Sequence, residues 1–221
     1  MYSKIISILI IFTMLMSRAT VAYSMATPMS EVTNVLSSRT YSLADRYNNS
    51  YVNNVFADNI LLTLAYMRGT VKEGQTVNWN MVKSDFTYTM VLKSGTSFAF
   101  HDSVLPQYKN NVSQTTNAHF DASEGFESDG WLVGDGVCHL ASFINVVART
   151  ADLFVVSPTP HNFARIPDVP EKYGVAIYYM PGETGSSSMQ NLYITNTFNK
   201  PVAFIFTHNG TNLTIRVEKL G

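Results

Sequence analysis

Cys138 and His161 are the two residues of this chain whose types could together perform nucleophilic chemistry. Cys138 is the only cysteine, and it follows glycines at positions 134 and 136. The apolar residues after it predict a helix, and the positive end of a helix dipole favours a thiolate in the first turn. A histidine beside such a sulfur can take its proton, which activates the thiol toward an amide or acyl carbon. The pair therefore predicts cysteine-dependent amidase or acyl-transfer chemistry.

This chemistry also needs a group that orients the imidazole and donors that bind an oxyanion. Asn162 is the nearest candidate for the orienting group, and Asp168 is the second. The backbone amides of Cys138 and His139 are candidate oxyanion donors, so Gly136 and His139 are expected to line the cleft. In a helix, the side chain of His139 would point about 100° away from Cys138, which makes it a poor base partner.

Both residues of the pair have a second interpretation. An unpaired cysteine in an exported chain can be a reactive thiol, but a buried cysteine also behaves as a small apolar side chain. His161 follows Pro160 directly, and a histidine there can simply hydrogen-bond within a proline-rich turn. The sequence leaves both interpretations open.

The segment that carries Cys138 predicts the central helix of the fold. Its apolar residues recur at helical spacing: Leu140, Ala141, Ile144, Val147, Ala148 and Ala151. Phe143 and Val146 widen the apolar surface. A helix that is apolar on most sides is usually covered on most sides. We therefore expect it to be buried, with Asp135 as its N-cap.

The remaining pattern predicts an α+β fold in which this buried helix packs on an antiparallel sheet. An earlier helix is expected over 59–69, with Asp58 as a possible cap and Gly69 at its end. Alternating residues predict strands at 86–92, 97–100, 154–157, 174–179, 190–196, 202–207 and 213–218. Asn209-Gly210 predicts a hairpin between the last two strands.

The stretch from Asp102 to Gly130 is polar and lacks periodicity. It is long for a loop inside a compact domain, and such loops are often functional. His119 and Glu124 lie in it, and without a partner in view each is interpreted as a solvated side chain rather than a ligand.

Composition limits the classes of function. The chain has 221 residues, of which 46% are hydrophobic and 14% charged, and its net charge of −1 gives no basic surface for nucleic acid. One cysteine and five scattered histidines lack the spacing of a zinc site. The third glycine of a dinucleotide fingerprint is missing as well. We therefore predict neither metal nor cofactor.

The N-terminus predicts export. Lys4 precedes an apolar stretch from Ile5 to Met16, and Ala22-Tyr23-Ser24 has the small residues of a cleavage site. About twelve apolar residues are too few for a transmembrane helix, which needs about 20. Residues 1–24 are therefore interpreted as a signal peptide, and contact with a membrane is expected only if this segment stays uncleaved. Residues 25–84 are interpreted as a lead-in that contains a helix.

The second part of the chain, residues 85–221, resembles the VanW family, which is named for an accessory protein of vancomycin-resistance clusters. The resemblance covers about residues 85–218. It rests on an ordered series of motifs: Leu92-Lys93-Ser94-Gly95-Thr96-Ser97-Phe98, Gly134-Asp135-Gly136-Val137-Cys138, Arg149-Thr150-Ala151-Asp152-Leu153, Pro160-His161-Asn162, Val169-Pro170, Asn191-Leu192-Tyr193-Ile194-Thr195-Asn196-Thr197 and Lys200-Pro201-Val202. The chain lacks the first His of the family's His-x-His segment and the Asp of its next strand.

The resemblance implies a protein of the bacterial envelope in a peptidoglycan context. Two functions follow. The first is a cysteine-dependent amidase or acyl-transfer enzyme that acts on peptide amides of the wall. The layout then expected resembles transglutaminase-like and papain-like enzymes, in which a cysteine opens the central helix. The alternative is a non-catalytic module that binds wall polymer or a partner protein and in which Cys138 is structural.

Overall fold

A four-stranded antiparallel sheet forms one layer of the molecule in the computed structural model, which describes residues 34–130 and 132–221. Its order is β1-β8-β7-β2, with β1 Asn34–Ser42, β2 Phe86–Leu92, β7 Val202–Asn209 and β8 Asn212–Lys219. Period-two alternation places Phe204 and Phe206 in the core and leaves Thr87 exposed. The predicted hairpin is confirmed: Gly210 has φ +62° in the two-residue turn between β7 and β8.

A second, smaller sheet lies across the core from the first and has the order β4-β3-β6-β5. Its strands are short: β3 Ser97–Ala99, β4 Val112–Gln114, β5 Phe154–Val156 and β6 Tyr193–Thr195. β3 and β4 are parallel, whereas β6 pairs antiparallel with both β3 and β5.

The first long helix, α1, spans Ser50–Met67 and begins nine residues before the predicted start at residue 59. Asn49 is its N-cap, and the Asn49 side chain accepts hydrogen bonds from the amides of Tyr51 and Val52. The first turns mix exposed, partly buried and buried residues and include several polar side chains, so a continuous apolar pattern starts only near Asn59 and hides the true beginning.

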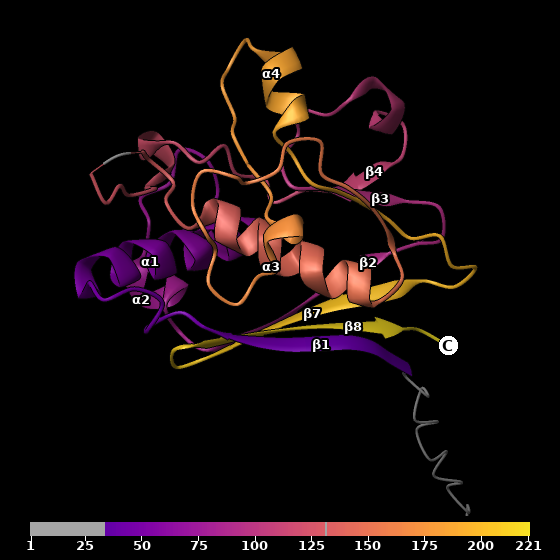
Figure 1. Cartoon of the computed structure of the whole chain (residues 1–221), viewed down its shortest axis with the longest axis horizontal. Helices are drawn as coiled ribbons and strands as arrows, with labels where there is room; N and C mark the ends of the chain where they lie inside the picture. Colours follow the sequence, from indigo (N-terminus) through magenta and orange to yellow (C-terminus); the bar gives the residue numbers. More distant parts are fainter. Residues whose placement is uncertain (1–33, 131) are drawn as a thin grey trace, which may run out of the picture. The chain divides into compact units, whose positions relative to one another are not determined.

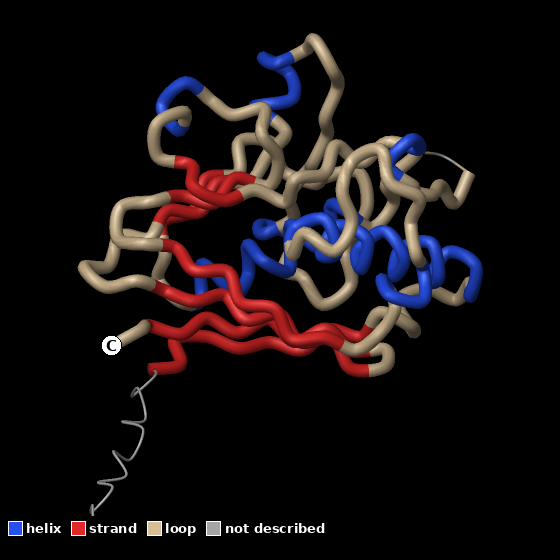
Figure 2. The backbone as a smooth tube through the Cα atoms, turned by 180° about the vertical axis from the view of Figure 1, so that it is seen from behind, coloured by secondary structure: helices blue, strands red, loops and turns tan. Residues whose placement is uncertain are grey.

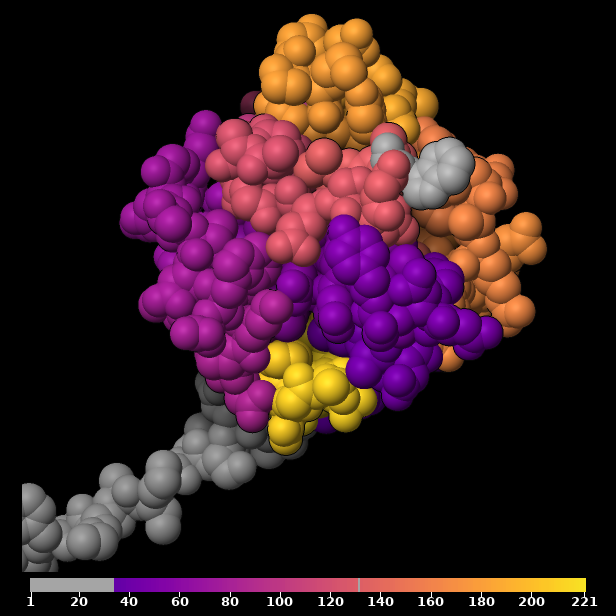
Figure 3. All heavy atoms as spheres, turned by 90° about the vertical axis from the view of Figure 1, so that its left-hand side faces the viewer, coloured from indigo at the N-terminus to yellow at the C-terminus, as the bar shows by residue number. Residues whose placement is uncertain are grey.

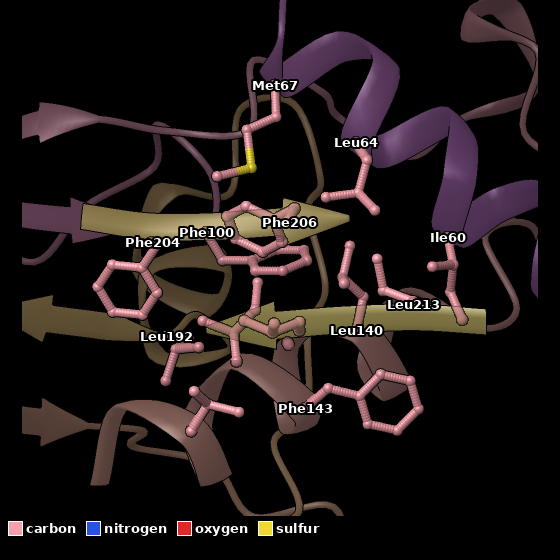
Figure 4. Close-up of a cluster of buried hydrophobic side chains, with 14 of the residues drawn as sticks. Ile60, Leu64, Met67, Phe100, Leu140, Phe143, Leu192, Phe204, Phe206 and Leu213 are labelled. Atoms are coloured by element: carbon pink, nitrogen blue, oxygen red, sulfur yellow. The ribbon is translucent and has the colours of Figure 1, made fainter. Parts of the chain in front are cut away.

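The central helix, α3, spans Val137–Thr150 and is buried along nearly its whole length, as its apolar pattern predicts. It packs against α1, β1 and β8, and the ring of Phe143 stacks on Tyr41 of β1 at 3.9 Å between centroids. Figure 1 shows both helices above the large sheet, and Figure 4 shows the apolar side chains that fill the space between them. The α+β class is therefore confirmed.

Short helices and loops complete the fold. The helices are α2 Trp79–Val82, α4 Thr184–Met189, η1 Pro106–Tyr108, η2 Ala122–Glu124 and η3 Glu171–Tyr173. Except for α2, which packs against α1, these short helices and loops lie on the side of α3 away from the large sheet (Figure 1 and Figure 2). Among the described residues, no helix combines the length and the apolar character that crossing a membrane requires. The predicted signal peptide at 1–24 lies outside the described residues.

Residues 34–84 are an integral part of the domain rather than a lead-in to it. β1 pairs with β8 from Asn34 to Ser42, and α1 supplies much of the core. The described residues form one compact unit as a result. The boundary expected at residue 84 therefore separates no structural units, because the last strand of the chain has its partner near the start.

Tyr41→Ala tests this assignment. Tyr41 is 2% exposed and its ring stacks on Phe143, so its truncation should lower the free energy of unfolding by about 3–5 kcal/mol. Tyr51→Ala is the matched control, because Tyr51 is 57% exposed and its loss should cost below about 1 kcal/mol. Urea unfolding at neutral pH measures both. Equal stability of the two variants would contradict an integral β1.

Candidate functional site

Cys138 lies in the first turn of α3, where its sulfur is bound by the backbone of Ile177. The Ile177 amide donates to Sγ at 3.3 Å, and the thiol donates back to the Ile177 carbonyl at 3.6 Å. Burial, together with a smaller contribution from the nearby Asp135 carboxylate, raises the pKa of the Cys138 thiol to about 11. A helix dipole contributes about 0.3–1 kcal/mol, less than the ~1.4 kcal/mol of a single pKa unit. Desolvation therefore prevails, and the expected thiolate does not form at neutral pH.

Cys138 is one of three residues of α3 that bind the backbone of residues 173–177. We call Cys138, Ser142 and Asn145 the polar stripe of α3. Ser142 Oγ accepts from the Val175 amide at 2.9 Å, and Asn145 Nδ2 donates to the Tyr173 carbonyl at 2.9 Å. Positions i, i+4 and i+7 lie on one face of a helix, so the stripe matches an extended backbone beside it.

The stripe explains why the expected strand at 174–179 is absent. Only Val175 makes a β-bridge, to Pro160, and the other residues belong to neither sheet. On one edge of the segment, the amides of Val175 and Ile177 that a neighbouring strand would normally bind are taken by side chains of α3, while the Ala176 amide on the other edge bonds to the Thr159 carbonyl. The alternation in the sequence thus reflects an extended segment that packs on a helix.

His161 is buried at 6% exposure, and its imidazole bonds to its own loop. Nδ1 donates to the Ala164 carbonyl at 2.9 Å, and the ring packs on Phe163 with centroids 4.0 Å apart. Burial lowers the pKa of His161. Among the described residues, no hydrogen bond joins His161 to Cys138, whose sulfur bonds to Ile177 instead. The structure therefore shows no bond between the two residues of the predicted catalytic pair.

The two candidates for the orienting group are also elsewhere. Asn162 is exposed, and its side chain makes no hydrogen bond to another described residue. It lines a pocket of about 540 Å³ together with His161 and the loop up to Glu171. Asp168 is exposed, and its carboxylate lies 3.5 Å from Nη1 of Arg46. Neither side chain bonds to the His161 ring.

Gly136 and His139 are covered by Phe56 of α1 and do not line an open cleft. Gly136 has φ +97°, and a Cβ there would stand 2.6 Å from the Phe56 carbonyl oxygen of α1. His139 is 4% exposed, with Nε2 3.2 Å from the Tyr47 hydroxyl and its ring against Phe56. Burial holds the pKa of His139 well below its usual range. The first turn of α3 is thus packed against α1 and gives no open oxyanion site at these residues.

Asp135 does not cap α3, contrary to expectation. Gly136 is the N-cap residue and makes no side-chain capping bond. The Asp135 carboxylate accepts from the Asp129 amide at 2.9 Å instead. Burial, together with the neighbouring Asp129, raises the pKa of Asp135 to about 6.

A groove that the sequence interpretation missed lies beside the start of α3. We call it the α3 groove, and it encloses about 250 Å³. Its lining comes from three segments of the chain: His119, Phe120, Asp121, Ala122, Leu132, Val133, Gly134, Val137, Ile177, Tyr178 and Tyr179. Figure 3 shows the side of the molecule where residues 120–130 and 132–140 meet the start of α1.

His119 sits at the groove between two carboxylates, contrary to its interpretation as a solvated side chain. Nε2 is 3.4 Å from Asp102 Oδ2, and Nδ1 is 3.2 Å from Glu124 Oε1. The ring also lies against Tyr179, with centroids 4.4 Å apart. Three separate parts of the chain therefore meet at this imidazole.

Glu124 is buried at 2% exposure and holds the loop that forms the groove. Its Oε2 accepts from the amides of His119 at 2.7 Å and Phe120 at 2.8 Å. Phe120 has φ +67°, an unfavourable conformation for a bulky residue. Burial raises the pKa of Glu124. The signals in the sequence were the length of the 102–130 loop and the spacing of His119 and Glu124, but neither showed burial.

Comparison with family models, with curated proteins and with solved structures finds no match for this chain. Among the described residues, no group of three or more His, Cys, Asp or Glu side chains is arranged to hold a metal ion.

Ser142→Ala tests the polar stripe. The substitution leaves the buried Val175 amide without its acceptor, so the free energy of unfolding should fall by about 1–3 kcal/mol. Ser113→Ala is the control, because Ser113 is exposed and its loss should change stability by less than about 0.5 kcal/mol. Denaturant unfolding compares them, and a neutral Ser142→Ala would mean that the stripe is not needed to hold residues 173–177.

The alkylation rate of Cys138 tests its environment. With a pKa of about 11, the rate should still rise almost tenfold between pH 8.5 and 9.5, whereas an ordinary thiol with a pKa of about 8.5 levels off there. His161→Ala should leave the profile unchanged. A plateau near neutral pH that disappears in His161→Ala would show an activated pair.

Proposed function

We propose that this chain is an exported envelope protein of the VanW type that binds the peptide part of the cell wall without cleaving it. The observation that carries the proposal is the state of Cys138, whose thiol is bound to the Ile177 backbone and whose pKa is raised to about 11. A cysteine amidase needs a thiolate beside an imidazole. The contacts of Cys138 and His161 support a structural role for both residues.

The α3 groove is the binding site in this proposal. Exposed apolar side chains are concentrated at its rim, where Leu132 is 63%, Val133 47% and Tyr178 38% exposed. Exposed apolar groups gathered at a concave site favour ligand binding over a purely structural surface. The floor is formed by Phe120, Val137 and Ile177, and this apolar surface suits the side chains of a short peptide.

The same observations connect the structural cysteine to binding. Ile177, which Cys138 holds, belongs to the groove, and Tyr178 and Tyr179 follow it directly. The polar stripe of α3 therefore supports one wall of the proposed site. In this proposal, Cys138 contributes to binding by fixing the backbone and not by attacking the ligand.

Co-sedimentation with purified peptidoglycan sacculi tests the function. The wild-type chain should pellet with intact sacculi and release no new amino groups from them. It should stay in solution with sacculi from which the stem peptides have been removed enzymatically. Tyr178→Ala should reduce pelleting several-fold, because it removes part of the rim.

Two further variants serve as controls. Phe154→Ala removes an aromatic side chain that is 55% exposed on β5 and does not line the groove, so it should pellet like wild type. Cys138→Ser keeps a donor and acceptor toward Ile177 and should also pellet like wild type. Release of amino groups that depends on Cys138 would establish the amidase instead. Binding to the glycan alone, or no binding to intact sacculi, would refute the peptide-binding function.

A further inference from the structure

The charged side chains around the α3 groove are acidic. Asp121 lines it, and Asp102 and Glu124 flank His119 at one end. Burial raises the pKa of Tyr179, and the carboxylates of Asp102, Glu124 and Glu73 raise it further. No Lys or Arg stands among the described residues that line the groove. The electrostatic surroundings therefore favour a positive ligand group.

Glu124 places part of this charge where water cannot screen it. Its side chain is 2% exposed, and Oε2 is satisfied by two backbone amides. Oε1 has no hydrogen-bond partner among the described residues, and Nδ1 of the His119 ring lies 3.2 Å from it. Because His119 lines the groove, the carboxylate stands directly behind its wall. Charges act more strongly across a poorly hydrated wall than through water.

Asp121 supplies an ionised carboxylate at the surface of the groove. Its Oδ1 accepts from the Ser123 hydroxyl at 2.6 Å and from the amides of Ser123 and Glu124. The bond from the Ser123 hydroxyl is the main reason that the pKa of Asp121 is lowered. This carboxylate thus stays negative at neutral pH and is fixed in position by η2.

The start of α3, which would favour an anion, is not available to a ligand. The Val137 amide donates to the Gly134 carbonyl at 3.0 Å, and Gly136 is pressed against the Phe56 carbonyl of α1. Asn59 of α1 also binds the Asp135 carbonyl at 2.8 Å. Helix amides that are packed in this way do not offset the acidic end of the groove.

We propose that the α3 groove binds the side chain of a basic residue in a peptide, and this inference rests on the proposed function. The methylene stem lies on Phe120, Val137 and Ile177, and the ammonium group faces Asp121 and the Asp102 side of His119. The electron-rich faces of Tyr178 and Tyr179 add a cation–π attraction. The groove thus offers an apolar surface to the stem of a lysine-like side chain and negative charge to its ammonium group.

NMR titration of the ¹⁵N-labelled protein tests the proposal with two peptides. The first is acetyl-Leu-Lys-Ala-amide, and the second carries norleucine in place of lysine, which keeps the stem and removes the charge. The lysine peptide should bind at least tenfold more tightly at low salt and shift the amides of 119–122, 132–134 and 177–179. Its affinity should fall as salt is added.

Variants assign the selectivity to the groove. Asp121→Asn keeps the acceptor for Ser123 and should weaken the lysine peptide several-fold while leaving the norleucine peptide unchanged. Asp45→Asn removes an exposed carboxylate outside the groove and should change neither affinity. Equal affinity for the two peptides, an unaffected Asp121→Asn, or no shift at these amides would overturn the inference.

The outcome separates this inference from the function on which it rests. Tyr178-dependent binding to sacculi together with equal affinity for both peptides would retain the function and remove the charge selectivity. Selective binding of the lysine peptide without binding to sacculi would retain the charge selectivity and remove the cell wall as its source.

Discussion

The contact between the polar stripe of α3 and the extended segment 173–177 is the constraint on which the site depends. A helix buried on nearly all sides must satisfy every polar group that meets it, because an unpaired buried amide costs about 1–3 kcal/mol. Cys138, Ser142 and Asn145 satisfy backbone groups of Ile177, Val175 and Tyr173. The helix therefore replaces a neighbouring strand, and the segment stays extended outside either sheet.

This constraint decides the chemistry of Cys138. A cysteine in the first turn of a helix is often activated, but activation requires that the thiolate be hydrated or paired with a cation. Here the sulfur faces the Ile177 backbone, and the nearest charge that acts on it is the negative Asp135. The contacts that Cys138 makes are those of a packing and hydrogen-bonding group.

The α3 groove follows from the same arrangement. One wall of the groove is formed by Ile177, which the stripe binds, and by the two tyrosines that follow it. The other wall is the loop that contains Phe120, whose backbone has a positive φ and whose amide binds the buried carboxylate of Glu124. Strained backbone persists only where surrounding bonds hold it in place, and it is frequent at binding sites. The tyrosines and Ile177 come from a segment that lies 40 residues or more along the chain from the other lining residues, which belong to 119–122 and 132–137.

The sequence by itself determined the local structure. The apolar period of α3, the alternation of β2, β7 and β8 and the turn at Asn209-Gly210 could be predicted because each depends on neighbouring residues and on one buried face. Only the tertiary structure decided the partner of Cys138, the hydrogen bond of His161 to the Ala164 carbonyl and the burial of Glu124. Burial and hydrogen-bond partners depend on segments that are distant along the chain, and the type of a residue does not indicate which distant segment will pack on it. The strand expected at 174–179 was wrong for a related reason. A strand and an extended segment that packs on a helix both bury every second side chain, so the two give the same alternating pattern in the sequence.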